Sequence, residues 1–398
     1  MGPTAIRPHR KGRLYNRPGR QPSRYICISL FLSSCLWMPD GRMLDVVRYL
    51  TGAVGPSGFG SKSTAEQVTE ASPFSLLSST AIITGATSGI GAETARVLAK
   101  RGVRLVLPAR NVKAAEETRS RIREETPSAE VIVMSLDLSS MASVRSFVAE
   151  FERLGLPLNI LINNAGKFCH RRAVSEDGIE MTFATNHLGH FLLTKLLLKK
   201  MIQTAEVSGV EGRIVNVSSS IHGWYDGDDV TCEELTRQKK RYDPTRAYAL
   251  SKLANVLHAK ELAKRLKKLN ANVTANSVHP GIVRTRLTRE REGFITDLAF
   301  FSASKLLKTI PQVMIPLSPG YDPFDIPFPK LAGFLAAATT CYVATHPRVS
   351  GVSGRYFADC NEASTSRLGA SETAAVRLWE ISEELTTATP ERHVVRSC

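Results

Sequence analysis

The 398-residue sequence lacks the features that mark disulfide-stabilised, metal-binding and membrane-spanning proteins. Its seven cysteines contain no C-x-x-C pair, and an odd number without ligand spacing favours a reducing compartment. No apolar run is long enough for a transmembrane helix, and the chain has no internal repeat. With 43% hydrophobic and 22% charged residues, the composition is that of a globular protein.

Acidic residues are nearly absent from residues 1–42, where Asp40 is the single acid among eight basic residues. This segment carries +7 of the net charge of +15, and an apolar run at 25–38 follows its basic part. Such an order resembles a targeting segment. An erroneous upstream extension is the alternative, because Met43 is itself a candidate start. The remaining charge indicates a solvated surface, and we expect no nucleic-acid partner.

We expect one folded domain over residues 63–388, preceded by an extension and linker and followed by a flexible tail at 389–398. Residues 1–62 are interpreted as a disordered or targeting segment. Its last part, residues 51–61, is rich in Gly and Ser and is interpreted as a flexible linker. Ser63 and Glu66 have the spacing of a capping box, which predicts a short helix there.

From residue 80 onward, short β-rich runs alternate with helical periodicity. The alternation predicts an α/β fold with a doubly wound parallel sheet of Rossmann type, in a single domain with an N-terminal extension. The expected strands are residues 80–84, 104–107, 131–136, 159–163, 213–217, 272–277 and 355–358. The expected helices are residues 91–101, 112–125, 141–154, 185–201 and 246–269.

A glycine-rich turn, TGATSGIG, joins the first expected strand to the first of these helices. Such a turn directs backbone N–H groups and a helix N-terminus at a phosphate. Its G-x-x-x-G-x-G spacing differs from the more familiar G-x-G-x-x-G, but its place between strand and helix favours dinucleotide binding. The candidate cofactor-binding residues in this turn are Gly85, Thr87, Ser88, Gly89, Ile90 and Gly91.

No acid follows the second expected strand, where one would hydrogen-bond an unmodified adenosine ribose. Arg110 and Asn111 stand there instead. Because arginine pairs well with phosphate, Arg110 predicts NADP(H) rather than NAD(H). The alternative is a solvated surface arginine.

Tyr248 and Lys252 lie four residues apart, on one face of an expected helix. A free tyrosine titrates near pH 10, and a neighbouring ammonium group would stabilise its phenolate form. A lone Y-x-x-x-K pair often arises by chance, so the surrounding pattern decides. Polar or turn residues end four expected strands, and a parallel sheet brings such ends to one edge. They are Asn163–Asn164, Ser218–Ser219, Asp137–Leu138 and His279–Pro280–Gly281.

In combination, TGATSGIG, NNAG, the paired serines, YALSK and HPG resemble the short-chain dehydrogenase/reductase superfamily over about residues 64–385. The segments STAEQV, LDLSSMASVRSF, ATNHLGHFLLT and SKLANVLHAKEL are most similar to one plant branch. That branch contains the chloroplast inner-envelope translocon dehydrogenase and lies close to retinol-dehydrogenase-like enzymes.

The resemblance implies roles for individual residues. Tyr248 would exchange the proton with the substrate oxygen, and Lys252 would lower the pKa of Tyr248 and hold the nicotinamide ribose. Ser219 would hydrogen-bond the reacting oxygen, and Asn186 would anchor the relay water. Other residues would border the cofactor: Asp137, Leu138, Asn164, Ala165, Gly166, Pro280, Gly281, Val283 and Thr285.

These observations predict an NADP(H)-dependent oxidoreductase that interconverts a carbonyl and an alcohol, with a small lipophilic substrate and no metal. The alternative is an NADP(H)-sensing regulatory subunit of a chloroplast envelope import complex. The resemblance implies the stromal side of the chloroplast inner envelope, with the cytoplasm as the alternative. A homo-oligomer and peripheral association with an envelope complex are further expectations.

Several residues also have plainer interpretations. His187 and His190 are interpreted as core residues, because no acid or cysteine follows at metal-ligand spacing. Asn186 could be a helix cap, Ser218 a packing residue and Asn163 a brace of the sheet. A basic run is interpreted as a solvated helix face, with calmodulin or acidic lipid as the alternative. It comprises Lys260, Lys264, Arg265, Lys267 and Lys268.

Residues 313–335 depart from the family pattern. Five prolines in this segment exclude a regular helix, so we expect a surface loop or a translated intron. Apolar residues between 287 and 307 are interpreted as a substrate cover or as core.

Overall fold

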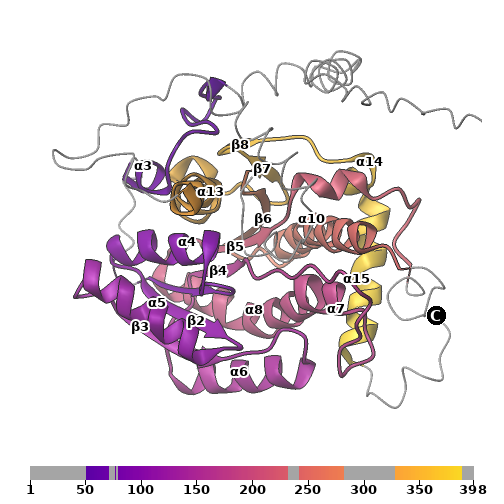
Figure 1. The fold of residues 1–398 in the computed structure, drawn as a ribbon, viewed down its shortest axis with the longest axis horizontal. Helices are drawn as coiled ribbons and strands as arrows, with labels where there is room; N and C mark the ends of the chain where they lie inside the picture. The colour runs from indigo at the N-terminus through magenta and orange to yellow at the C-terminus, as the bar shows by residue number, and fades with distance from the viewer. Residues whose placement is uncertain (1–50, 71–76, 78, 232–241, 282–327, 388–398) are drawn as a thin grey trace, which may run out of the picture. The chain divides into compact units, whose positions relative to one another are not determined.

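The sheet at the centre of the protein has eight strands in the order β3-β2-β1-β4-β5-β6-β7-β8 (Figure 1). The computed structural model describes residues 51–70, 77, 79–231, 242–281 and 328–387. Neighbouring strands run parallel from β3 through β7, and β8 pairs antiparallel with β7. The expected α/β fold with a doubly wound parallel sheet is therefore confirmed.

The strands begin and end close to their expected positions. Their bounds are β1 Thr80–Ile83, β2 Arg104–Ala109, β3 Val131–Ser135, β4 Ile160–Asn163, β5 Gly212–Val217, β6 Val273–His279, β7 Tyr356–Ala358 and β8 Asn361–Glu362. Four residues of β1, four of β4 and six of β5 are all buried. Strands covered on both faces are nearly continuous in hydrophobic residues, which explains these β-branched runs.

Helices cover both faces of the sheet. The core on one face is formed with α6 Met141–Arg153, α8 Gly189–Ser208 and α10 Pro244–Lys268, and α15 Glu372–Thr387 packs on α10. The other face packs on α3 Ala65–Glu70, α4 Gly89–Lys100, α5 Val112–Glu125 and α13 Phe328–Thr345 (Figure 1). Ile82 faces the first group and Ile83 the second, because alternate side chains of a strand point to opposite faces.

The helix expected at residues 185–201 begins earlier, ends later and consists of three consecutive helical segments. Its parts are α7 Met181–Phe183, a π-helical turn η1 Ala184–Leu188, and α8. Short helices at η2 Ser220–Trp224, η3 Pro347–Val349 and α14 Arg367–Ala370, together with α15, were not expected from the pattern.

The capping box at the start of α3 is shifted by one residue from its expected position. Thr64 and Gln67 cap each other, with Gln67 N–H donating to Thr64 Oγ1 (3.2 Å) and Thr64 N–H donating to Gln67 Oε1 (2.9 Å). Glu66 instead pairs with Arg96 (3.0 Å) and Lys100 (3.2 Å) of α4. The predicted Ser63–Glu66 box is wrong, because these ion pairs engage the Glu66 carboxylate.

Residues 55–61 pack against the folded domain, although their composition suggested a flexible linker. Ser57 N–H donates to Asn361 Oδ1 (3.0 Å), and Asn361 Nδ2 donates to the Phe59 carbonyl (3.0 Å). Arg348 Nη1 donates to the Ser57 carbonyl (2.7 Å), and the Phe59 ring lies 5.9 Å from that of Tyr342. These bonds join residues about 300 positions apart, so tertiary contacts override the local preference for disorder.

Part of the proline-rich segment is helical. Helix α13 begins at Phe328, so the expectation that residues 313–335 contain no regular helix is wrong from that residue onward. Pro329 occupies the first turn, where the missing N–H has no helical partner in any case. Residues 313–327, and the expected cover at 287–307, lie outside the described residues.

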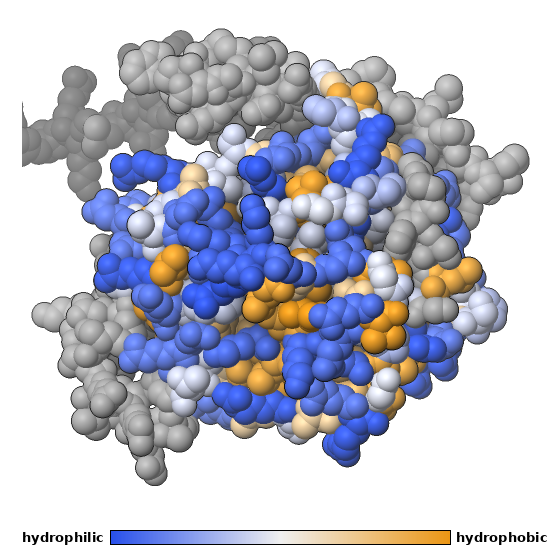
Figure 2. All heavy atoms as spheres, turned by 180° about the vertical axis from the view of Figure 1, so that it is seen from behind, coloured by the Kyte–Doolittle hydropathy of each residue, from blue (hydrophilic) through white to orange (hydrophobic). Residues whose placement is uncertain are grey.

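Across the described ranges, no helix combines the length and apolar character needed to cross a membrane. Hydrophilic side chains cover most of the face shown in Figure 2, with hydrophobic side chains visible between them near its middle. The large hydrophobic side chains that are exposed come from separate elements, among them Val112 of α5, Val207 of α8 and Trp224 of η2.

Candidate functional site

The glycine-rich turn between β1 and α4 packs directly on the end of β4. A Cβ atom at Gly85 would lie 2.7 Å from the Ala165 Cα, and one at Gly91 would lie 2.4 Å from Asn164 Nδ2. Asn164 Nδ2 donates to the carbonyls of Thr84 (2.7 Å) and Gly85 (3.3 Å). The two glycines are therefore required by this close approach, and Asn164 fixes the shape of the turn.

The first turn of α4 has the features of a phosphate site. Ser88 is its N-cap residue, yet the Ser88 side chain makes no capping hydrogen bond. Backbone N–H groups at such an end lack helical partners, and the helix dipole favours a negative charge there. The turn therefore fits a dinucleotide diphosphate.

Arg110 and Asn111 follow β2 at the same edge of the sheet. Arg110 is exposed. Asn111 is the N-cap of α5, where its side chain accepts a hydrogen bond from Ala114 N–H (3.1 Å). The structure thus gives Asn111 a clear role in starting a helix and leaves the Arg110 guanidinium accessible to a ligand.

The ends of β3 and β6 complete this edge. Asp137 Oδ1 accepts hydrogen bonds from Ser139 N–H (2.9 Å) and Ser139 Oγ (2.6 Å), while the Leu138 side chain is buried. Pro280 and Gly281 directly follow β6. Val283 and Thr285, the other two residues expected to cover the cofactor, lie outside the described residues.

Hydrogen bonds tie the end of β5 to helix α10. Lys252 Nζ and Asn255 Nδ2 both donate to the Val217 carbonyl (3.0 and 3.1 Å), and Ser218 Oγ donates to the Lys252 carbonyl (2.7 Å). Ser218 is therefore a packing residue, as expected. Ser219 follows as the N-cap of η2, which packs against α10. This arrangement brings Ser219 and Tyr248 onto adjoining elements.

Burial changes the pKa values of both groups in the Tyr248–Lys252 pair. Burial raises the pKa of Tyr248 to about 12 and lowers the pKa of Lys252 to about 8. Lys252 Nζ lies 5.6 Å from the centre of the Tyr248 ring. The expected lowering of the tyrosine pKa by the ammonium group is thus outweighed here by the loss of water around the hydroxyl.

Asn186 lies inside the π-helical turn η1, not at a helix end, so its interpretation as a cap is wrong. Its Oδ1 accepts from Lys167 N–H (2.7 Å), and its Nδ2 donates to the Lys167 carbonyl and to Ser251 Oγ (both 3.0 Å). A Cβ atom at Gly166 would lie 3.5 Å from Lys252 Nζ and 3.9 Å from Asn186 Oδ1. Gly166 therefore lies close to both side chains.

A buried histidine connects the start of the glycine-rich turn to Asn186. His190 Nδ1 donates to the Asn186 carbonyl (3.1 Å), so its Nε2 accepts from the Thr84 hydroxyl (2.8 Å). Thr84 Oγ1 in turn accepts from the N–H groups of Asn164 (2.9 Å) and Ala165 (3.0 Å). The sequence pattern indicated that His190 is a core residue but carried no signal for its contact with Thr84.

His187 and Asn163 have packing roles. His187 Nε2 lies 2.9 Å from Ser382 Oγ of α15, which joins α15 to η1. Asn163 Nδ2 donates to Thr194 Oγ1 (2.9 Å) and Asn216 Oδ1 (2.8 Å), which braces β4 against α8 and β5. The interpretation of Asn163 as a brace is confirmed.

Comparison with known proteins identifies the family. Residues 79–226 match the model of the short chain dehydrogenase family. Over 350 residues the chain is 44% identical to "Short-chain dehydrogenase TIC 32 B, chloroplastic" of Brassica napus, covering 87% of this chain and 100% of that protein. The chain belongs to the short-chain dehydrogenase/reductase family. Human retinol dehydrogenase 14 is 38% identical over 317 residues, 76% of this chain and 85% of that protein.

Solved structures agree with this assignment. The structure of an uncharacterized protein from Mycobacterium paratuberculosis superposes with a TM-score of 0.59 at 29% identity, covering 82% of this chain and 98% of that one. The fold is also that of Pseudomonas aeruginosa RhlG, with a TM-score of 0.51 at 23% identity over 71% of this chain and 95% of that one. Members of this family are NAD(P)-binding oxidoreductases that act on small molecules.

Proposed function

We propose that this short-chain dehydrogenase uses NADP(H) to interconvert a carbonyl and an alcohol on a small lipophilic molecule, with Tyr248, Lys252, Ser219 and Asn186 as its catalytic residues. The joining of β5 to α10 carries this proposal, because it brings the Ser219 turn and the Tyr248 helix together beside a buried lysine. The uncapped start of α4 supplies the matching phosphate site.

The chain's own residues would divide the acid–base work. The bound nicotinamide supplies or takes the hydride. During reduction, the Tyr248 hydroxyl donates its proton to the carbonyl oxygen, and Ser219 Oγ hydrogen-bonds the same oxygen. The Lys252 ammonium stabilises the phenolate that remains and holds the cofactor ribose. Asn186 holds the water through which the proton is replaced. During alcohol oxidation, Tyr248 accepts the proton in the opposite direction.

NADP(H) is preferred to NAD(H) in this proposal because Arg110 is exposed at the end of β2, where a 2′-phosphate would lie. A charge-assisted contact of this kind is worth about 1.5 to 3 kcal/mol, or roughly tenfold or more in affinity. Titrating NADPH and NADH against the wild type and Arg110→Ala tests the preference. Equal affinities of the wild type for both cofactors would contradict it.

The activity is tested with nonanal, benzaldehyde and retinal in the presence of NADPH, and with the matching alcohols in the presence of NADP. We expect turnover by the wild type and loss of turnover in Tyr248→Phe, with NADPH affinity nearly unchanged because the ring remains. Activity that persists in Tyr248→Phe would require a different acid.

Chloroplast location is part of the proposal, because the Brassica napus relatives at 44% identity are named as chloroplastic. We place the protein at the stromal side of the inner envelope, where it would associate peripherally with an envelope complex and form homo-oligomers. The second candidate function is an NADP(H)-sensing subunit of such a complex. It would bind NADPH but leave all three aldehydes unreduced, so the same assay separates the two.

A further inference from the structure

A single peptide group beside Ser219 is held from both sides by histidine rings. The carbonyl of Ser219 and the N–H of Ser220 belong to the same peptide group. His222 Nδ1 lies 2.7 Å from the Ser219 carbonyl oxygen, and Ser220 N–H donates to His279 Nδ1 (3.2 Å). The two rings come from different elements, His222 from η2 and His279 from the end of β6.

The hydrogen bonds fix the protonation of both rings. A carbonyl can only accept, so His222 Nδ1 carries a hydrogen, and its Nε2 is then free to accept from Ser366 N–H (3.1 Å). His279 Nδ1 accepts and therefore carries no hydrogen. Burial lowers the pKa of His222, and it lowers the pKa of His279 to about 4. Both rings are thus neutral at the pH of a chloroplast or cytoplasm.

Packing fixes His222 further. Its side chain is buried, and its ring meets the Tyr356 ring edge-on, with centroids 5.0 Å apart. Through Ser366, the N-cap of α14, it also joins the Ser219 turn to the C-terminal part of the chain. By contrast, within the part of the chain that the structure describes, the Ser219 side chain itself makes one long bond, accepted from Ile221 N–H (3.4 Å). The backbone, not the side-chain bond, therefore sets where the Ser219 hydroxyl lies.

We infer that His222 and His279 are positioning residues that clamp the Ser219–Ser220 peptide group and so hold the Ser219 hydroxyl in place for the reacting oxygen. This inference rests on the proposed function, in which Ser219 hydrogen-bonds that oxygen. Because His279 directly precedes Pro280 and Gly281, the clamp also ties Ser219 to the turn expected to cover the nicotinamide.

Two substitutions of His222 separate hydrogen bonding from packing. His222→Phe keeps an aromatic ring against Tyr356 but removes both ring nitrogens, whereas His222→Asn keeps an amide donor near the Nδ1 position. With nonanal and saturating NADPH, we expect His222→Phe to lower kcat about tenfold. This is the effect of weakening one hydrogen bond, from Ser219 Oγ to the reacting oxygen. His222→Asn should retain most of the wild-type kcat, and NADPH affinity should stay unchanged in both. His279→Phe should lower kcat as His222→Phe does. His279→Asn should retain most of the wild-type kcat, because an Asn side-chain oxygen can accept from Ser220 N–H.

His346→Phe is the matched control. His346 Nδ1 also accepts a backbone hydrogen bond, from Arg348 N–H (3.2 Å), but it is the N-cap residue of η3 and has no contact with Ser219 among the described residues. The kcat of this variant should equal that of the wild type.

A double-mutant cycle shows whether His222 acts through Ser219. In a Ser219→Ala background, His222→Phe should lower kcat no further. If His222→Phe lowers kcat equally in both backgrounds, or if His222→Asn is as inactive as His222→Phe, the clamp is overturned. If Ser219→Ala alone leaves kcat unchanged, the proposed role of Ser219 fails instead.

Amide hydrogen exchange tests the clamp without turnover. The Ser220 amide should exchange faster in His222→Phe and His279→Phe than in the wild type, and at the wild-type rate in His346→Phe. Unchanged exchange in the first two variants would overturn the clamp even if the protein reduced none of the aldehydes.

Discussion

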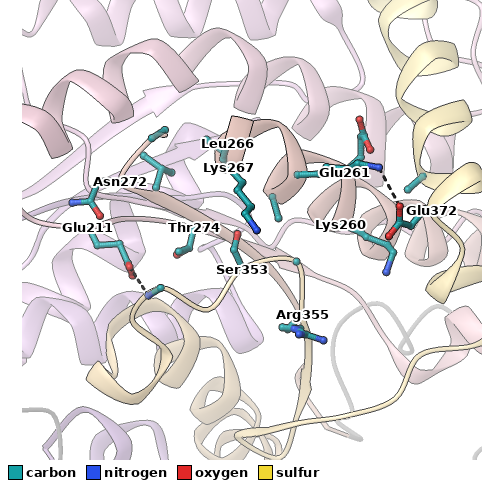
Figure 3. A pocket seen from close by; sticks show the side chains of 17 residues that line it. Glu211, Lys260, Glu261, Leu266, Lys267, Asn272, Thr274, Ser353, Arg355 and Glu372 are labelled. Carbon is teal, nitrogen blue, oxygen red and sulfur yellow. Dashed lines mark hydrogen bonds and ion pairs between the residues drawn. The ribbon is translucent and has the colours of Figure 1, made fainter. Parts of the chain in front are cut away.

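The two ends of the sheet differ in how they hold their polar side chains. At the carboxyl end, Thr84, Asn186, His190 and Lys252 are buried, and each makes hydrogen bonds to groups of the backbone or of its neighbours. At the amino end of β6, a hollow of about 690 Å³ is lined by charges of both signs. Figure 3 shows this hollow, with Lys267 directed into it near Ser353. Lys264 also lines the hollow and pairs with Glu372 (3.1 Å).

The two ends differ in how strongly the stability of the fold depends on the partners of each polar side chain. A buried polar group destabilises the fold unless it is hydrogen-bonded, so each residue at the carboxyl end depends on its partners. Exposed ion pairs contribute little, so the charges around the hollow are exchangeable. Lys260 and Lys267 of the basic run line this hollow (Figure 3). Substitutions of the same kind at the two ends should therefore have unequal effects.

The largest difference is expected between two lysines of α10. Lys252→Met should lower turnover by about two to three orders of magnitude and weaken NADPH binding, because in the proposed function the buried ammonium would serve both the phenol and the ribose. Lys267→Met, at the hollow, should change neither. Steady-state kinetics and NADPH titration measure both effects. Equal losses in the two variants would mean that the α10 helix, rather than its ammonium group, is what matters.

Acid should destabilise the carboxyl end through its buried histidines. Burial lowers the pKa of His190 to about 4 and that of His258 to about 3, so the unfolded chain binds protons first as the pH falls below 6.5. The contribution of each neutral histidine to the free energy of unfolding is therefore fully present above pH 6.5. By pH 5 the free energy of unfolding should have fallen by about 2 kcal/mol per histidine. Asp359, whose pKa burial raises to about 6, acts in the opposite direction. Urea unfolding at pH 7 and pH 5 measures the balance, and equal stability at both would refute it.

Two threonines give a smaller contrast in stability. Thr84→Val removes the hydroxyl that serves His190, Asn164 and Ala165, and should lower the free energy of unfolding by about 2 to 3 kcal/mol. Thr274 is also buried, but its hydroxyl makes one long bond to the Gly212 carbonyl (3.5 Å) beside the hollow. Thr274→Val should therefore cost about 1 kcal/mol or less. Urea midpoints of both variants measure the difference, and equal costs would contradict the comparison.

The smallest expected effect comes from the segment before α3, outside both ends. Phe59→Ala removes ring contacts with Tyr342 and His346, and should lower the free energy of unfolding by about 1 kcal/mol. Val54→Ala is the control, because Val54 is 66% exposed. A protein that begins at Ser63 should also melt at a lower temperature. If its melting temperature is unchanged, residues 51–61 behave as the linker that their composition suggests.

Local pattern and motif order were enough to predict the fold. They also named the side chains of the candidate site, whose roles stay predictions. Strands β1, β4 and β5 were predictable because a strand buried on both faces is rich in hydrophobic residues. The glycine-rich turn, the paired serines and the Tyr248–Lys252 spacing then fell at the carboxyl edge, because the strands are parallel. Helix α5 matched its expected bounds because Asn111 caps it locally.

Tertiary contacts decided what no local pattern encodes. The docking of residues 55–61 depends on Asn361 and Arg348, about 300 residues away. The neutral state of His190, His222 and His279 depends on burial and on partners from other elements, as does the rise in the pKa of Tyr248. The sequence by itself therefore determined which side chains reach this edge of the sheet. Only the tertiary structure decided how they are protonated and held, because desolvation and hydrogen bonding are set by neighbours that are distant in the chain.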